Sequence, residues 1–276
     1  MKIRNAVVEG RFYPSTKNRI FEQIRKIEAS NRYPLKELFP VKVFGAVLPH
    51  AGHIYSGYQT IPFFNLINRL EIAPETFIIV HPNHSGAGLS LAIDDAEVWR
   101  NSIGEVPLDR EFAVAMDLPF DRMAHAKEHS AEVIIPFLQY YLSEHHFSIL
   151  PISMKDQSFP NASLVAQRIR QAIEVTGRKI MVIASCDFSH FLSPQEGQQK
   201  DQQVIDNILL RDTKGVELAV TKHHVSVCGY GPIMTLMEYA NTLSSDYRVQ
   251  ILARGHSGEA VPSREVVDYI SMIMYQ

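Results

Sequence analysis

Short, continuously apolar runs alternate along this chain with longer stretches in which apolar residues recur every three or four positions. A run such as Val43–Leu48 has no polar side, which is typical of a strand buried on both faces of a sheet. Runs of this kind predict strands at 43–48, 76–80, 89–93, 147–152, 179–184 and 248–253. The pattern in the region 86–107 is weaker and predicts a hairpin or an edge strand.

The stretches between these runs have the period of a helix. In the segment 18–30, Ile20, Ile24 and Ile27 fall on one face, and Asp109 is placed to cap the helix that follows it. Helices are predicted at 18–30, 59–70, 109–116, 131–143, 162–176, 198–211 and 232–243. Strands that alternate with helices of this length predict an α/β fold in three layers, α/β/α, with a mostly parallel central sheet.

The chain of 276 residues contains no internal repeat, low-complexity tract or long linker. We therefore expect a single domain that covers residues 1–276. With 46% hydrophobic and 21% charged residues, the composition is that of an ordinary globular protein. The net charge of −3 comes without a basic stripe, so no nucleic-acid partner is expected.

No apolar run reaches 18 residues, so no membrane span is expected. The first residues lack the long apolar run of a signal peptide. Two cysteines without a CxxC pair suit a reducing compartment rather than a disulfide-rich secreted protein. Together these observations predict a cytoplasmic protein.

Histidine is the residue type that indicates chemistry, with 12 in the chain. Three predicted strands end in polar loops that carry histidines, at 49–57, 81–86 and 185–190. Because ligands of α/β proteins bind beyond the carboxyl ends of the strands, these loops are expected to meet at one rim. A single histidine after a strand is usually a hydrogen-bonded structural residue, but three such loops together favour a site.

Neutral imidazole is the commonest metal-ligand side chain, and catalytic metal sites take about three protein ligands. His50 and His84 are the best first pair, since each directly follows a strand. Cys228 precedes a glycine-rich turn and a new helix, where a thiol gains thiolate character and can serve as ligand or nucleophile. An equally good interpretation makes Cys228 a small buried hydrophobe.

Two further groups are candidates for proton transfer. Asp187 and His190 form a D-x-x-H pair, in which the carboxylate would orient the imidazole, although an Asx turn has the same sequence. His129 lies in the segment 128–132, which opens a predicted helix, and it is expected to reach the same pocket, unless Ser130 acts only as a cap. His125 is predicted to lie on the surface.

Several common motifs are absent from the sequence: HExxH, GxxxxGK[ST], GxGxxG after a strand, and GxSxG. The sequence therefore favours neither a zinc protease nor a nucleotide site, and it has no nucleophile elbow.

Five blocks, in this order, resemble those of the Memo family. HAGHIYSG at 50–57 is similar to the family's HAGYxYSG, and PNHSG at 82–86 is similar to its GPNHxG. The later blocks are EHSAE at 128–132, SCDFSH at 185–190 and CGYGPI at 228–233, with further similarity in GRFYP at 10–14 and near the carboxyl end.

The resemblance implies a fold similar to the class III extradiol dioxygenases of the LigB type, which hold Fe(II) with two histidines and one glutamate. In the Memo family the positions of His50 and His84 keep the histidines, and a cysteine at the position of Cys228 replaces the carboxylate. The histidine that matches His190 falls where the dioxygenases place their acid/base. Prokaryotic members are also called AmmeMemoRadiSam system protein B, which implies companion proteins of that set as partners.

Two positions depart from the family pattern. His53 stands where tyrosine is usual, and His81 stands where glycine is usual. Both are expected to add nitrogen atoms to the pocket, with Tyr13 contributing to an aromatic wall.

The sequence thus predicts a metal-dependent redox enzyme with a small-molecule substrate. Fe(II) would be held by His50, His84 and Cys228, with His190 as general base and Asp187 orienting it. The thiolate also suits copper or zinc. The alternatives are a non-enzymatic module that binds a peptide or protein in the cleft, and a copper- or iron-handling protein.

Overall fold

Four parallel strands form the centre of the fold in this computed structural model, which describes residues 1–35, 38 and 42–276. They lie in the order β2 (Val43–Leu48), β8 (Ile180–Ser185), β3 (Thr76–Pro82) and β7 (Ser148–Met154). Their side chains are almost all buried, which explains why the sequence shows them as unbroken apolar runs. The predicted parallel sheet is confirmed for this centre.

Antiparallel strands extend the sheet at both edges. β11 (Val266–Tyr275) pairs with β2, and β10 (Arg248–His256) pairs with β11. At the other edge β4 (Leu91–Ile93) pairs with β7, and the short β9 (His190–Leu192) pairs with the start of β11. The sheet is therefore mixed, with its parallel strands in the middle.

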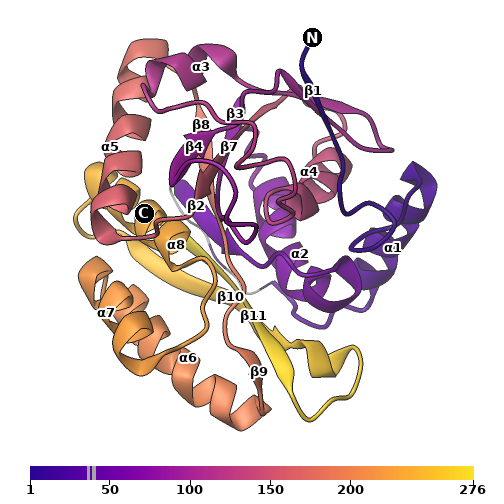
Figure 1. Cartoon of the computed structure of the whole chain (residues 1–276). Coiled ribbons are helices and arrows are strands. Elements are labelled where there is room, and N and C mark those ends of the chain that lie inside the picture. The colour runs from indigo at the N-terminus through magenta and orange to yellow at the C-terminus, as the bar shows by residue number, and fades with distance from the viewer. Residues whose placement is uncertain (36–37, 39–41) are drawn as a thin grey trace.

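Helices cover both faces of this sheet (Figure 1). One side carries α3 (Arg110–Ala115), α5 (Phe159–Thr176), α7 (Thr213–His223) and α8 (Tyr230–Leu243). The other side carries α1 (Lys17–Ala29), α2 (His53–Arg69) and α4 (Ile135–Tyr141), which a 3-10 turn at Glu132–Ile134 precedes. α6 (Pro194–Leu209) packs against α7 and the outer part of β10 and β11.

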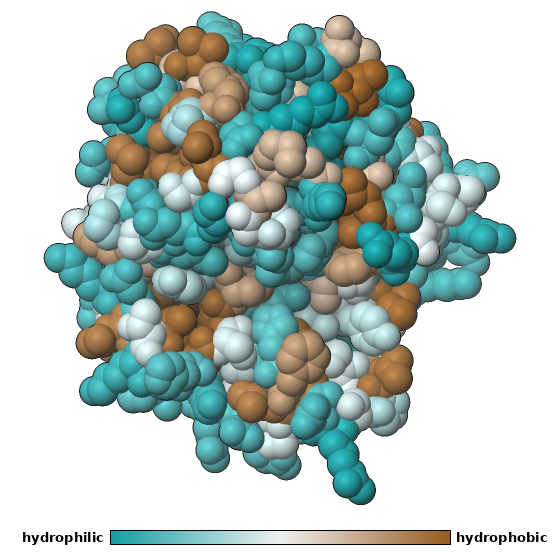
Figure 2. All heavy atoms as spheres, in the orientation of Figure 1, coloured by the Kyte–Doolittle hydropathy of each residue, from teal (hydrophilic) through white to brown (hydrophobic). Residues whose placement is uncertain are grey.

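The strand residues alternate between two hydrophobic cores. Ile78 and Val80 of β3 pack on the side of α5 and α8, whereas Phe77 and Ile79 pack on the side of α1 and α2. Figure 2 shows that hydrophilic side chains cover most of the visible face, with hydrophobic ones in separate small patches. Among the described residues, no helix combines the length and apolarity that crossing a membrane would require.

The region 86–107 contains both structures that its pattern predicted. β4 is an edge strand, and β5 (Val98–Arg100) forms a hairpin with β6 (Glu105–Pro107). The hairpin joins β1 (Ile3–Asn5) in a small separate sheet.

The main element that the sequence analysis missed is β11, together with α7 and the short strands β1 and β9. Asp268 and Ser271 interrupt the apolar run of β11, yet both are buried. Burial and the neighbouring carboxyl group of Asp201 raise the pKa of Asp268 to about 8, so its carboxyl group is largely uncharged at neutral pH. A polar residue in its neutral form is tolerated inside the sheet, and the sequence pattern does not show this.

The amino-terminal segment is fixed by a buried carboxylate. Glu132 accepts hydrogen bonds from the backbone amides of Val7 and Val8, from the hydroxyl of Tyr13 and, at 2.8 Å, from the guanidinium of Arg4. The segment in turn fixes the start of α2, because the carbonyl of Phe12 accepts the amide of His53 at 2.8 Å. This contact positions the loop that follows β2.

We expect the substitution Glu132→Gln to lower the free energy of unfolding by about 3–5 kcal/mol, because it leaves the buried Arg4 without its counter-charge. Urea unfolding followed by circular dichroism measures this loss, and Glu144→Gln on the exposed surface is the matched control. A loss equal to that of the control would contradict the role given to Glu132.

Candidate metal centre

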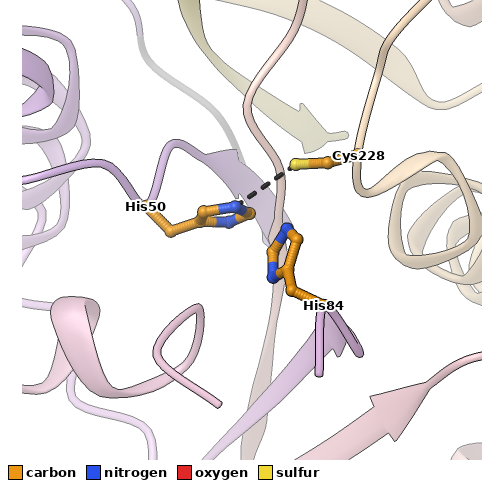
Figure 3. A group of neighbouring side chains, drawn as sticks. All are labelled: His50, His84 and Cys228. Atoms are coloured by element: carbon orange, nitrogen blue, oxygen red, sulfur yellow. Dashed lines mark hydrogen bonds between the residues drawn. The ribbon is translucent and has the colours of Figure 1, made fainter. Parts of the chain in front are cut away.

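Three potential ligand atoms from distant parts of the sequence lie together at the carboxyl end of the sheet. His50 follows β2, His84 follows β3, and Cys228 precedes α8. One ligand atom from each lies within 4.8 Å of the other two. Figure 3 shows the two rings and the sulfur turned toward one another, with His50 Nε2 at 3.2 Å from Cys228 Sγ. The sequence analysis named these three residues as candidate ligands, and the structure brings them together.

A chain of hydrogen bonds fixes the tautomer of His50. The hydroxyl of Ser185 donates to the carbonyl of Ser130 at 2.7 Å, so its oxygen is left to accept from His50 Nδ1 at 2.8 Å. The proton of the ring therefore sits on Nδ1. Nε2 is the nitrogen that faces Cys228, and it is the one that would bind a metal.

A buried carboxylate accepts the hydrogen bond from Nδ1 of His84. Glu128 accepts from His84 Nδ1 at 2.9 Å and from its backbone amide at 2.7 Å, and it is 1% exposed. Burial acts to raise the pKa of Glu128, but the hydrogen bond from His84 and the nearby imidazoles hold it far below its usual value. At metal sites, the nitrogen of a histidine that does not bind the metal commonly donates a hydrogen bond to a carboxylate.

The sequence analysis gave Glu128 no role of its own. The available signal was its position directly before His129 in the EHSAE block.

The sulfur of Cys228 sits in surroundings that favour the thiolate. The backbone amide of Asp187 donates to it at 3.3 Å. Burial acts to raise the pKa of Cys228, but hydrogen bonds from Cys186, His50 and His84 hold it well below the usual value of a thiol. Burial lowers the pKa of His84, yet its bonds to Cys228 and Glu128 bring it to about 10. The metal-free group is therefore an imidazolium–thiolate pair.

His129 lies beside the pair of histidines. Its ring stacks on that of His84 at 4.9 Å between centroids and meets the ring of His50 edge-on at 5.5 Å. With His84 and Glu128 it forms a second group of potential ligand atoms within 4.8 Å. Burial and the neighbouring His50 lower its pKa to about 4, so the ring is neutral at pH 7 and able to accept a proton.

Asp187 and His190 do not form the pair that the D-x-x-H spacing suggested. Asp187 Oδ1 accepts the backbone amide of His50 at 2.8 Å, so this carboxylate holds the loop of the first ligand. His190 Nδ1 donates to the carbonyl of Ser226 at 2.8 Å. Among the described residues it is Ser226, and not Asp187, that orients the ring of His190.

His53 and Tyr13 belong to the interior between the amino-terminal segment and α2. His53 Nε2 donates to the carbonyl of Val133 at 2.8 Å, and its ring packs against Tyr13 and Phe137. Burial lowers the pKa of His53 to about 4, so the ring is uncharged. Neither residue belongs to the two groups of potential ligands found in the described part of the chain.

His81 is also fully buried and lies outside those two groups. Its Nε2 is 3.2 Å from Nδ1 of His125, and its Nδ1 is 3.2 Å from the hydroxyl of Ser130. The prediction that His125 lies on the surface is wrong, because the segment that carries it folds under β4 and His125 Nε2 reaches the carbonyl of Ala92 at 3.2 Å. His53 and His81, the two histidines that depart from the family pattern, thus pack as neutral hydrogen-bonding residues.

The metal-free protein is expected to hold one thiolate at neutral pH. Because the pKa of Cys228 is lowered, its ultraviolet thiolate absorbance should persist as the pH falls well below about 8.5, the usual midpoint of a thiol. The variant Cys228→Ala should lack this signal, since burial raises the pKa of the remaining Cys186. An absorbance in the wild type that rises only above about pH 8.5 would contradict the assignment.

Comparisons with known proteins identify the fold and the family of the chain. A crystal structure of an uncharacterized Escherichia coli K12 protein, JW3007, is similar in fold, with a TM-score of 0.56 at 11% identity over 84% of this chain and 99% of that one. A MEMO1 family protein of Archaeoglobus fulgidus is 36% identical over 98% of this chain and 99% of its own length. Another, from Pyrobaculum aerophilum, is 33% identical over the full length of both.

The model of one protein family, described as Memo-like protein, matches residues 4–273. The relatives match over nearly their whole length, and the ligand loops described above lie within the matched residues. The chain therefore belongs to the family of Memo-like proteins.

Proposed function

We propose that this protein is a metal-dependent redox enzyme in which His50, His84 and Cys228 hold a single iron ion, Fe(II). The observation that carries the proposal is the orientation of the three donor atoms, which the surrounding hydrogen bonds fix. In both imidazoles Nδ1 is committed to a hydrogen-bond acceptor, so Nε2 is the nitrogen that faces the sulfur and would bind a metal in exchange for its proton. A purely structural histidine would not need its second nitrogen directed at a thiol in this way.

The donor set fits a catalytic metal better than a structural one. Three protein ligands leave a position for substrate or water, whereas structural zinc sites are closed by four. Two imidazoles and a thiolate suit iron, copper or zinc and do not suit the oxygen-loving Mg²⁺ and Ca²⁺. Bound iron or copper would supply Lewis acidity and electron transfer to O₂.

The residues around the ligands can handle protons. His129 is neutral and stacks on His84, so its ring is placed to take a proton from a hydroxyl group bound at the open side. His190 has Nδ1 held by Ser226, which leaves Nε2 as an acceptor. We assign the role of general base to these two histidines. Asp187 serves instead by holding the loop of His50.

The resemblance to extradiol dioxygenases of the LigB type suggests the substrate class, a small aromatic molecule with two adjacent hydroxyl groups. The ring of Phe12 lies 4.8 Å from that of His129 and supplies an apolar wall on that side. Replacement of the usual glutamate by Cys228 makes the site softer, which also opens it to copper or zinc.

A second candidate function is a binding module for a peptide or a companion protein of the AmmeMemoRadiSam set. The side chain of Phe191 favours it, because it is 72% exposed and adjoins His190, with 6.0 Å between ring centroids. An exposed aromatic residue beside a candidate site suits recognition of a peptide side chain. Metal uptake without turnover would instead indicate copper or iron handling.

Protein purified anaerobically without an affinity tag is expected to contain close to one iron per chain, measured by inductively coupled plasma mass spectrometry. Cys228→Ala and His84→Ala should each lose the metal, because each removes one of three ligands. His145→Ala is the control, since His145 is exposed and outside the site.

The same preparations then decide between the functions through O₂ consumption with a panel of catechols. Turnover that disappears in Cys228→Ala supports the enzyme. No metal in the wild type after Fe(II), Cu(I) and Zn(II) are offered overturns it and favours the binding module.

Glu128→Gln tests the second partner of His84. The introduced amide is uncharged, so it forms a weaker hydrogen bond with Nδ1 of His84 than the carboxylate does. Metal affinity should therefore fall roughly 10- to 100-fold, although His50, His84 and Cys228 all remain. Competition with a metal chelator measures the affinity, and Glu144→Gln is again the matched control. An unchanged affinity would show that Glu128 has only a structural role.

A further inference from the structure

A cavity lies at the opposite end of the sheet from the metal centre. It has a volume of about 530 Å³ and is lined by the first residues of β2 and β8, by the loop before β3, and by α5 and α8. The strands β2 and β8 run parallel, and it is their carboxyl ends that lead to His50 and Asp187. One strand length of roughly 20 Å therefore separates the cavity from the metal centre.

The inner surface of this cavity is apolar. It is formed by side chains from four segments: Ile72, Pro74, Ile173, Met181 and Leu243. Ile173 is partly buried against the core on the α5 and α8 side of the sheet, and Met181 belongs to the core on the α1 and α2 side. A volume within the usual range of about 300–1,000 Å³ for small-molecule sites, together with an apolar floor, is what a ligand of modest size requires.

The rim of the cavity is positively charged. Its lining contains Lys42, Arg170, Arg178 and Lys179, against the single acidic residue Glu71. Arg170 pairs with Glu174 at 2.9 Å, and Arg178 pairs with Asp109 and Glu111. The ammonium groups of Lys42 and Lys179 have no carboxylate within ion-pair distance in the described part of the chain, so their charge is available to a ligand.

Tyr239 supplies an unsatisfied hydrogen-bond donor. Its side chain lines the cavity although the residue is only 4% exposed. Its hydroxyl has no partner among the described residues, and it is not one of the fully enclosed unpaired atoms, so it opens to the cavity. Buried tyrosine hydroxyls are usually hydrogen-bonded. Burial raises its pKa to about 12, which keeps the proton on the oxygen at neutral pH.

We propose that this cavity is a binding site for a small carboxylate with an apolar body, such as an arylalkanoic acid. The hydroxyl of Tyr239 donates to the carboxylate, and Lys42 and Lys179 neutralise its charge. The body of the ligand lies on the apolar surface formed by Ile72, Ile173 and Leu243. The site is separate from the metal centre in both position and chemistry.

The test uses the full chain with methionine methyl groups labelled with ¹³C, and 4-phenylbutyrate as the probe. Met181 lines the cavity, and its signal is assigned with Met181→Leu. We expect a saturable shift of this signal, with the neutral 4-phenylbutanol binding roughly tenfold more weakly. Tyr239→Phe and Lys179→Gln should each weaken binding severalfold, whereas Lys222→Gln on the exposed surface should leave it unchanged.

Two further variants distinguish binding in this cavity from binding at the metal centre and from non-specific binding. Leu243→Trp fills the cavity and should abolish the shift, while His84→Ala should leave the affinity for 4-phenylbutyrate unaltered. A shift lost in His84→Ala, equal binding of the alcohol, or no saturable shift in a folded wild type would each overturn the proposal.

Discussion

The carboxylate of Glu128 is buried, and it is compensated by an imidazole and backbone amides rather than by a lysine or arginine. Through it, the segment 128–130 controls both histidine ligands. Glu128 holds Nδ1 of His84, and the carbonyl of Ser130 holds Nδ1 of His50 through the hydroxyl of Ser185. A burial cost of several kcal/mol for an unpaired carboxylate makes this arrangement nearly obligatory, so the direction of both rings follows from it.

The same segment is tied to the beginning of the chain. Arg4 donates to the carbonyls of His125 and Glu128 as well as to the carboxylate of Glu132. Two buried carboxylates four residues apart thus have different tasks. Glu128 turns toward the ligands, and Glu132 fastens the amino-terminal segment, whose Phe12 carbonyl holds the start of α2. Stability and ligand geometry are therefore coupled through one short stretch of chain.

Much of this arrangement could be predicted from the sequence. The parts that could not be predicted were hidden for physical reasons. Strands buried on both faces leave unbroken apolar runs, so the four central strands were found, whereas the buried Asp268 concealed β11. The loops of His50 and His84 were found because parallel strands bring their carboxyl ends together. The direction of a ring leaves no trace in the sequence: His81 lies near the end of β3 and faces His125, whereas His84 follows β3 and faces the site.

The placement of β11 has a consequence for how the protein is made. The residues of β11 pair directly with β2, the strand that leads to His50, and they separate β2 from β10. A ribosome releases them long after it has released β2. Until then β2 has an open edge on that side, which is a surface prone to pairing with other chains. Folding of the sheet therefore waits for β11, and a nascent chain stalled before residue 266 would be a target for chaperones.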